Sequence, residues 1–474
     1  MTNSRDLNVL HWDLLTLSNL IRDKHISPVE VTKQLLERID SNNPTLNAYI
    51  TILHEEATEC ALQAEKEIAT GNWKGPLHGI PIGLKDLIYT KNIKTTMGSE
   101  IYKDYVPDYD AAVVEKLKQA GATIIGKLNT HQFAYGPTGD RSFYGPVKNP
   151  YNLSKITGGS SSGAGAAVAA SFCYAALGTD TGGSIRIPSA CCGIVGMKPT
   201  FGRVSKFGVH PLGFTLDHVG PMTRTVQDNA ILLNVLSGYD ERDPYSVKTN
   251  SEDFTRLIHQ GIKGSVIGIP ASYYFEHVDE EVDKKIREAI KVFQNLGAEI
   301  RSIDLPTMQR IILAQQITAK SEAYAIHEKN LQKHPEQYEE EVRERLLAGV
   351  ETKGYEYVQA QQLKQIAIQE FEDALREVDV LLTPTLPILS PDIDQREVTI
   401  QTYKEQVRSA LLRFTSPTNF NGLPSISIPC GFSVSGLPIG LQLIGRQFEE
   451  ANLYRFANAF EQECSIPTLK IEIT

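Results

Sequence analysis

Short apolar runs alternate with charged helical segments along most of this sequence, and this alternation restricts the possible folds more than any other feature. The helical segments include residues 279–296 and 355–377. Apolar runs between helices are typical of strands buried on both faces of a sheet. The sequence therefore predicts an α/β fold, in which helices cover a mostly buried sheet. The candidate strands are IPIGLK (80–85), ATIIGKL (122–128), VIGIP (266–270), VDVLLTP (378–384), SISIP (425–429) and IGLQLIG (439–445).

We expect one large domain over residues 1–474, because no internal repeat or low-complexity linker divides the chain. Helices are expected near the N-terminus, over about residues 12–70. One of them begins in the stretch SPVEVTKQLLERI, where Ser27 is a candidate N-cap and Pro28 suits the first helical position. Residues 386–406 are the best candidate for an irregular surface excursion.

Charge and cysteine content bear on partners and location. The formal net charge is −10, which argues against a nucleic-acid groove lined by Lys and Arg. The six cysteines include no C-x-x-C pair, so neither a zinc site nor a disulfide framework is expected. The N-terminal residues lack an apolar signal core, and no apolar run approaches membrane length. We therefore expect a cytoplasmic protein with no nucleic acid, membrane or metal among its partners.

A first candidate site is TGGSSSGAGAAVAA (157–170), which runs directly into an Ala-rich helical segment, unlike a flexible linker. It contains G-x-S-x-G around Ser161, the spacing of the α/β-hydrolase nucleophile elbow. That elbow requires a strong strand before it, and the preceding PYNLSKIT is a poor strand. An α/β-hydrolase would also need a histidine base, for which His210 and His218 are the nearest downstream candidates.

A second candidate site is GTDTGGSIRIPSA (178–190), in which Ser184 follows two glycines. Arg186 is expected to be structural, paired with Asp180. On its own the stretch is also compatible with a simple tight turn. Its consecutive backbone N–H groups are a candidate nest for a developing oxyanion, and they belong to Thr181, Gly182, Gly183 and Ser184.

A third candidate is Lys85, which ends the apolar run in GIPIGLKDLIYT (79–90). Burial of a lysine lowers its pKa and makes the neutral amine available as a base, although most lysines reach the surface. Because lysine can activate serine, Lys85 is expected to take a proton from Ser160, which takes the proton of Ser184. No S-x-x-K motif occurs, so a β-lactamase type of pair is not a competitor.

Together these stretches resemble the amidase signature enzymes. The block from Gly158 to Ser189, GGSSSGAGAAVAASFCYAALGTDTGGSIRIPS, fills every signature position, and GIPIGLKD matches the family's lysine strand. The resemblance extends over nearly the whole chain, through SPVEVTKQLLERI, CGIVGMKPTFGRVS and GLPSISIPCGFSVSGLPIGLQLIG.

The resemblance implies a single α/β/α domain with a twisted mixed sheet covered by helices. It implies a cis peptide between Gly159 and Ser160, and a supporting hydrogen-bonding role for Ser161. No metal or organic cofactor is implied. The implied Ser–cisSer–Lys triad falls on Ser184, Ser160 and Lys85, and the implied oxyanion hole falls on Thr181, Gly182, Gly183 and Ser184.

The resemblance predicts an amide hydrolase that works through an acyl-enzyme, with esters, anilides and carbamates as further substrates. The expected partner is a small-molecule amide, and a homodimer is a possible assembly. The alternatives are the glutaminase (A) subunit of a tRNA-dependent amidotransferase, which requires partner subunits, and a non-catalytic scaffold of the same fold. Phe133 and Tyr135 are candidate walls of the acyl pocket, although aromatic residues there are equally compatible with a core.

The family's amidotransferase subunits hold the ammonium and carboxylate of glutamine with an acid and an arginine. An alignment on QEFEDAL and FNGLP puts Lys364 at the arginine position and Leu412 at the acid position. Lysine keeps the charge without the bidentate fork of arginine, and leucine cannot pair with an ammonium. Burying that ammonium unpaired is costly. We therefore predict a preference for neutral, apolar or aromatic acyl groups over free glutamine.

Overall fold

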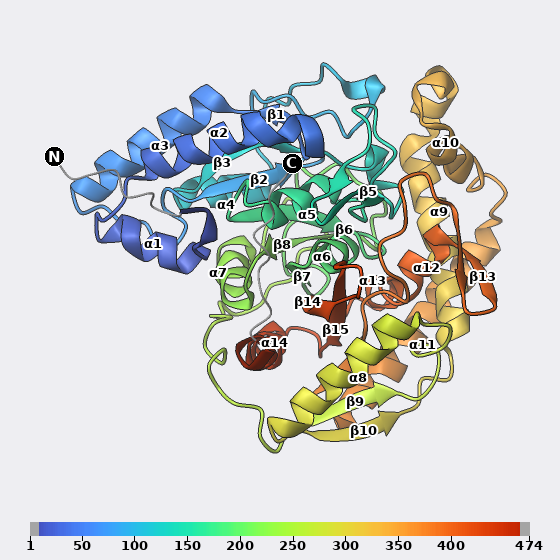
Figure 1. Cartoon of the computed structure of the whole chain (residues 1–474). Helices are drawn as coiled ribbons and strands as arrows, with labels where there is room; N and C mark the ends of the chain where they lie inside the picture. The colour runs from blue at the N-terminus through green and yellow to red at the C-terminus, as the bar shows by residue number, and fades with distance from the viewer. Residues whose placement is uncertain (1–8, 465–474) are drawn as a thin grey trace.

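A mixed sheet of 11 strands forms the centre of the computed structural model, which describes residues 9–464 (Figure 1). The pairs β2–β3, β2–β6, β9–β10 and β9–β11 are parallel, and the other neighbours are antiparallel. In spatial order the strands are β1 (Tyr49–Ile52), β3 (Thr123–Leu128), β2 (Pro81–Lys85), β6 (Ala175–Asp180), β8 (His218–Thr223), β7 (Val195–Lys198), β14 (Ser425–Phe432), β15 (Pro438–Ile444), β11 (Val380–Pro384), β9 (Val266–Pro270) and β10 (Glu299–Ile303).

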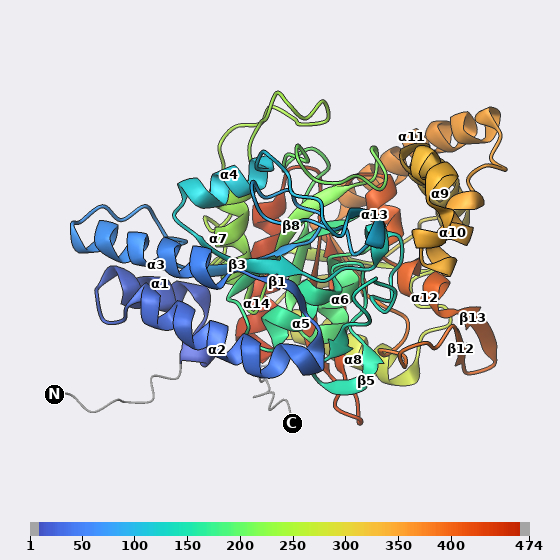
Figure 2. The same ribbon diagram turned by 90° about the horizontal axis from the view of Figure 1, so that it is seen from above.

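Fourteen α-helices of the described residues flank this sheet, which confirms the predicted α/β fold (Figures 1 and 2). None of the helices within residues 9–464 is both long and apolar enough to cross a bilayer. The helices are α1 (Leu14–Arg22), α2 (Pro28–Leu46), α3 (His54–Ala69), α4 (Ala112–Gln119), α5 (Ser162–Ala169), α6 (Arg186–Cys192), α7 (Val226–Leu236), α8 (Glu280–Asn295), α9 (Met308–Lys333), α10 (Glu340–Leu347), α11 (Gly354–Glu377), α12 (Val407–Arg413), α13 (Ser416–Phe420) and α14 (Glu450–Cys464).

Local sequence explains where α2 begins and which face it buries. The Ser27 side chain accepts hydrogen bonds from the backbone N–H groups of Val29 and Glu30, and Pro28 occupies the first helical position. Val31, Leu35 and Ile39 recur on one face and are almost fully buried. The buried face of α2 packs it against the rest of the molecule.

Helices α9–α12 stand together at one side of the molecule, next to a small hairpin (Figures 1 and 2). The hairpin pairs β12 (Glu397–Ile400) with β13 (Tyr403–Gln406) and leads directly into α12. Before the hairpin, Leu386 and Ile388 are buried in an apolar cluster that also contains residues of α6. The segment 386–406 therefore connects the helical side of the molecule to α6. A second two-stranded pair consists of β4 (Lys148–Asn149) and β5 (Asn152–Ile156).

The positions of β2 and β6 bring the two most informative sequence stretches together. The strands are parallel neighbours, with Leu84 opposite Leu177. Their carboxyl ends therefore meet at the same edge of the sheet, where ligands commonly bind in α/β folds. Lys85 ends β2, and Asp180 ends β6 immediately before the glycine-rich turn.

Candidate active site

Lys85 is fully buried, and its amine faces two hydroxyl groups. Nζ donates hydrogen bonds of 2.7 Å to Ser160 Oγ and of 2.7 Å to Thr179 Oγ1. Thr179 lies on β6, so the parallel pairing of β2 with β6 supplies this second contact. A buried ammonium or amine in this position is held by neutral hydroxyl oxygens rather than by a carboxylate.

Burial sets the protonation state of Lys85. Loss of hydration lowers the pKa of its amine from 10.5 to about 7, while the charges of Asp180 and Asp217 partly oppose this shift. At neutral pH a substantial fraction of Lys85 is therefore the free amine. Such an amine can accept a proton through the hydrogen bond to Ser160.

The segment around Ser160 is fixed by backbone and side-chain contacts. The Gly159–Ser160 peptide is cis, as the resemblance implies. The Ser161 hydroxyl donates to the Thr179 carbonyl (3.1 Å) and accepts from the Thr179 N–H (3.2 Å). The Ser161 N–H donates to the Ser184 carbonyl at 3.2 Å. These contacts tie the first serine stretch to β6 and to the turn that carries Ser184.

The turn from Thr181 to Ser184 connects β6 to α6 and presents free backbone donors. Within residues 9–464, none of its four N–H groups donates to a protein acceptor. Gly183 has φ +141°, and a Cβ atom there would lie 2.2 Å from Thr415 Oγ1. Only glycine therefore fits this position. The Thr415 hydroxyl donates to the Gly182 carbonyl at 2.6 Å and holds the turn from its other side.

Asp180 anchors the start of this turn. Its expected ion pair with Arg186 is confirmed, since Arg186 Nη2 donates to Asp180 Oδ1 at 2.9 Å and both side chains are buried. Burial alone raises the pKa of the Asp180 carboxyl, but the charge and hydrogen bonds of Arg186 hold it well below the usual value. The Asn419 amide also donates to the Asp180 backbone carbonyl, at 2.9 Å.

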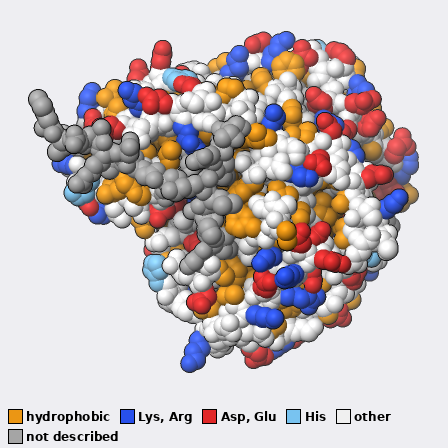
Figure 3. Space-filling model, viewed as in Figure 1, with side chains coloured by type: hydrophobic (Ala, Val, Ile, Leu, Met, Phe, Trp, Pro, Cys, Tyr) orange, Lys and Arg blue, Asp and Glu red, His pale blue; other side chains and the backbone are white. Residues whose placement is uncertain are grey.

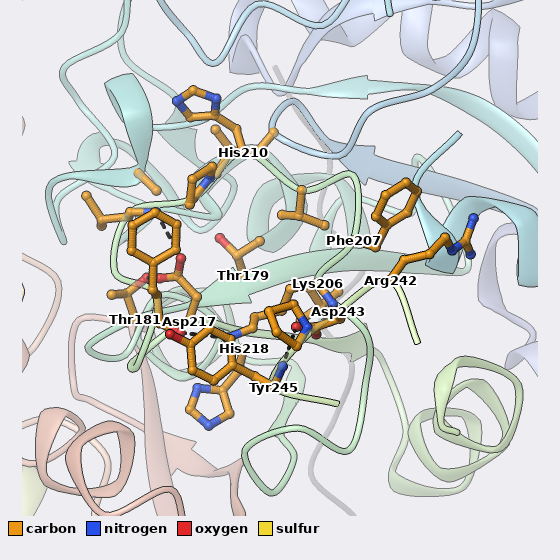
Figure 4. A pocket seen from close by; sticks show the side chains of 18 residues that line it. Thr179, Thr181, Lys206, Phe207, His210, Asp217, His218, Arg242, Asp243 and Tyr245 are labelled. Carbon is orange, nitrogen blue, oxygen red and sulfur yellow. Dashed lines mark hydrogen bonds between the residues drawn. The ribbon is translucent and has the colours of Figure 1, made fainter. Parts of the chain in front are cut away.

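Two residues that contact this turn, Asp217 and Thr415, were missed by the sequence analysis. Asp217 accepts a hydrogen bond of 2.5 Å from the Thr181 hydroxyl (Figure 4). It accepts further bonds from the N–H groups of Leu212 and Gly213. Asp217 is placed there because β8 runs antiparallel to β6, with His218 opposite Asp180. Neither Asp217 nor Thr415 lies in a recognisable motif, so only the pairing of distant segments reveals them.

Ser184 lies in the wall of a cavity of about 570 Å³. Of the two aromatic residues proposed as acyl-pocket walls, Tyr135 lines this cavity. Phe133 does not, because its ring packs among His210, His327 and Tyr338. The structure therefore places only one of the two rings next to the nucleophile candidate.

The two positions aligned with the glutamine-binding acid and arginine separate in space. Leu412 lines the Ser184 cavity and packs beside Gly182. Lys364 does not line it, and its amine donates to the Thr215 carbonyl at 2.9 Å. Burial lowers the pKa of Lys364 to about 8. Neither residue therefore presents a charged group to the cavity.

Figure 4 shows the residues that line a second, smaller cavity of about 220 Å³. Thr181 lines both cavities. Thr179 and His218 also line the smaller cavity. Burial lowers the pKa of His210 to about 4 and that of His218 well below its usual value. In the described part of the chain, neither histidine hydrogen-bonds to Ser184 or Ser161. The geometry thus offers no histidine base of the α/β-hydrolase kind.

Known proteins resemble this chain over nearly its full length. The sequence model of the Amidase family matches residues 30–454. The A subunit of the glutamyl-tRNA(Gln) amidotransferase of Geobacter sp. (strain M21) is 41% identical, and the match covers 94% of this chain and 96% of that protein. The structure of the corresponding protein from Thermotoga maritima is 32% identical, with a TM-score of 0.83, and covers 98% of this chain and 99% of that one.

A second similar structure is described as a vestigial protein complex that reveals the evolutionary origins of an s-triazine catabolic enzyme. It is 30% identical and has a TM-score of 0.92, covering 97% of this chain and 100% of that one.

These relatives correct the expectations about partners. The sequence analysis expected a small-molecule amide as partner, no nucleic acid, no membrane, and a possible homodimer. The expectation of a small-molecule amide with no nucleic acid is wrong, because relatives whose matches cover 94% or more of this chain are named as A subunits of a glutamyl-tRNA(Gln) amidotransferase. The physical error lies in the use of net charge. A charge of −10 is an average over 474 residues and describes neither a local surface nor a partner protein.

Proposed function

This chain belongs to the Amidase family, and from that premise we propose that it hydrolyses the C–N bond of a carboxamide through an acyl-enzyme formed on Ser184. The observation that supports this best is the 2.7 Å hydrogen bond from the buried Lys85 amine to Ser160 Oγ, beside the turn that carries Ser184. A lysine with a pKa near 7 is suited to general-base catalysis at neutral pH.

In the first half of the reaction, Ser184 Oγ attacks the carbonyl carbon. Its proton passes to Ser160 Oγ as the Ser160 proton passes to Lys85 Nζ. The carbonyl oxygen takes the electron pair of the broken π bond and is held by the N–H groups of residues 181–184. When the oxyanion collapses, the C–N bond breaks, and the leaving nitrogen receives a proton from Lys85 through Ser160.

In the second half, water replaces the amine. A water molecule gives its proton to the same relay and attacks the acyl carbon. Collapse of this second oxyanion breaks the bond to Ser184 Oγ, which regains a proton. The products are a carboxylic acid and ammonia or an amine, and the protein returns to its starting state.

The names of the relatives support a finer assignment, which the sequence analysis held as its alternative. Proteins 38–41% identical over nearly the whole chain are A subunits of glutamyl-tRNA(Gln) amidotransferases. On this assignment the amide is the side chain of glutamine, and the released ammonia is transferred within an assembly that contains further proteins and a tRNA.

A second candidate is a hydrolase for a different amide, and one specific observation favours it. Leu412 occupies the cavity position aligned with the acid that pairs with the glutamine ammonium. An ammonium placed against leucine would be desolvated without a counter-charge. This chain would then keep the chemistry of the family with another acyl group.

The chemistry common to both candidates is testable on the purified chain, alone and with co-expressed amidotransferase partners. A fluorophosphonate probe should add its mass to the peptide that contains Ser184, and Ser184→Ala should not be labelled. Ammonia release from a panel of carboxamides should require the same serine. Absence of both labelling and ammonia release in every preparation would refute the proposed function.

A further inference from the structure

The Ser184 cavity has an unusual balance of charge for an acidic protein. Figure 3 shows acidic and basic side chains interspersed over the face in view, in keeping with a chain whose net charge is −10. Inside the cavity, however, cations outnumber acids. Its charged lining residues are Lys320, Arg345, Arg408, Arg413, Glu276 and Glu405.

The two acids of the cavity are already engaged. Glu405 forms an ion pair with Arg413, whose guanidinium also donates to the Glu276 carbonyl at 2.8 Å. The Glu276 carboxylate accepts a hydrogen bond of 2.8 Å from the Tyr273 N–H and is itself exposed. Neither acid therefore neutralises the remaining cations.

Arg408, on α12, makes no hydrogen bond and no ion pair with any residue that the structure describes. Its Nε atom is nevertheless buried and without an acceptor. The guanidinium lies 6.0 Å from the centre of the Tyr135 ring, in the wall of the cavity. The guanidinium therefore brings to the cavity wall a positive charge that no acid of the described residues pairs with, and an anionic ligand would supply its counter-charge.

Arg345, on α10, faces the same space and shares its carboxylate partner with two other arginines. Its Nη2 lies 2.6 Å from Glu341 Oε2, but the same carboxylate also pairs with Arg141 (3.0 Å) and Arg396 (2.7 Å). Burial, and after it the nearby charge of Arg408, lowers the pKa of Arg345 to about 10. An anion bound between the two guanidiniums would relieve this repulsion.

We propose that Arg408 and Arg345 bind a carboxylate carried by the acyl part of the substrate amide. This inference rests on the proposed function, in which the scissile carboxamide reaches Ser184 in the same cavity. Guanidinium groups bind carboxylates through paired, charge-assisted hydrogen bonds, which fix both position and orientation. The acyl group is thus anionic, in contrast to the apolar acyl group expected from the sequence.

Leu412 offers no counter-charge to an ammonium on the acyl chain. The substrate class is therefore the monoamide of a dicarboxylic acid, preferred over the same acid carrying an α-ammonium, as in glutamine. A cavity of about 570 Å³ has room for a short acyl chain that spans from Ser184 to the arginines.

The test compares glutaramate with valeramide, a neutral amide of the same chain length, and with glutamine. In the wild-type chain, kcat/KM for glutaramate should exceed that for valeramide at least about tenfold. Arg408→Gln should lower kcat/KM for glutaramate about 10- to 100-fold and leave valeramide within about twofold. Lys404→Gln is the matched control, because it removes an exposed cation of the adjacent β13 that does not line the cavity, and it should change neither substrate.

Two results would overturn the inference while leaving the proposed function intact. One is equal kcat/KM for glutaramate and valeramide in the wild type. The other is an equal loss of both activities in Arg408→Gln, which would show a structural role. If no amide is hydrolysed, the proposed function fails. The inference is then tested separately, by calorimetric measurement of the affinity of Ser184→Ala for glutarate. Weakening of that binding at least tenfold by Arg408→Gln would support it, and absence of binding would refute it.

Discussion

Ser184 is the residue on which the proposed chemistry depends most directly. Ser184→Ala removes the attacking oxygen and leaves the backbone donors of the turn in place. We expect kcat for amide hydrolysis to fall by about four orders of magnitude or more, with residual turnover from binding and the oxyanion donors alone. Steady-state ammonia release measures this. Ser162→Ala is a suitable control, since it removes a neighbouring hydroxyl outside the proton relay. Near-normal kcat in Ser184→Ala would exclude Ser184 as the nucleophile.

Lys85 makes the reaction depend on pH in a defined direction. Burial lowers its pKa to about 7, and only the neutral amine accepts a proton. Activity should therefore be lost as pH falls below about 7, and kcat/KM should rise to a plateau above it. Lys85→Ala should lose several orders of magnitude at every pH. A pH–rate profile that stays flat from about pH 5 to about pH 9 would contradict a neutral Lys85 as the base.

Sequence reasoning found some residues of this site and missed others for a physical reason. Lys85 and Ser160 lie in glycine-rich or strand-end stretches that carry a recognisable pattern, and the structure joins them by a hydrogen bond of 2.7 Å. Their catalytic roles remain predictions. Asp217 and Thr415 carry no such pattern, because their contacts with the turn exist only after distant segments pair.

At the scale of single elements, the turn between β6 and α6 is shaped by a hydroxyl from another part of the chain. Thr415 Oγ1 donates to the Gly182 carbonyl at 2.6 Å. Thr415→Val keeps the shape of the side chain but leaves that buried carbonyl without its donor. We expect kcat to fall about 10-fold while KM changes little, because the turn positions the oxyanion donors rather than the acyl group.

The matched variant Thr415→Ser keeps the hydroxyl and should keep most of the activity. Thermal unfolding of both variants provides the second measurement. A parallel loss of kcat in Thr415→Ser, or a large fall in Tm with unchanged kcat in Thr415→Val, would show that Thr415 stabilises the fold without positioning the turn.

The existence of elements was more predictable than their pairing. All six apolar runs form strands of the large sheet, and the segments 279–296 and 355–377 form α8 and α11. β8 was not predicted, because Gly220 and Pro221 interrupt its apolar pattern, and both residues are uncommon in central strands. The mixture of parallel and antiparallel pairs depends on contacts between distant segments, which periodicity does not report.

At the scale of the whole molecule, composition was informative about fold and misleading about partners. The hydrophobic content of 41% is ordinary for a globular protein, and the described residues bury a large apolar cluster. The net charge of −10 does not describe the cavity beside Ser184, which three arginines line, nor the assemblies of the relatives. Local charge, read from the arrangement of side chains, is the quantity that predicts binding.

Dependence on partner proteins is the prediction that belongs to the whole chain. In the isolated chain, Leu412 and Lys364 leave the glutamine ammonium without an acid and its carboxylate without the aligned arginine. We expect kcat/KM for glutamine to lie at least about a hundredfold below that for the best carboxamide, since each tenfold corresponds to only about 1.4 kcal/mol. Co-expression with the remaining amidotransferase components should yield a complex, and glutamine hydrolysis by that complex should exceed that of the chain alone at least about tenfold. Ammonia release from both preparations measures this. The amidotransferase assignment is rejected if glutamine turnover is equally poor in both preparations while the chain alone hydrolyses another amide efficiently. The missing counter-charges would then be a property of the cavity itself and not of an incomplete assembly.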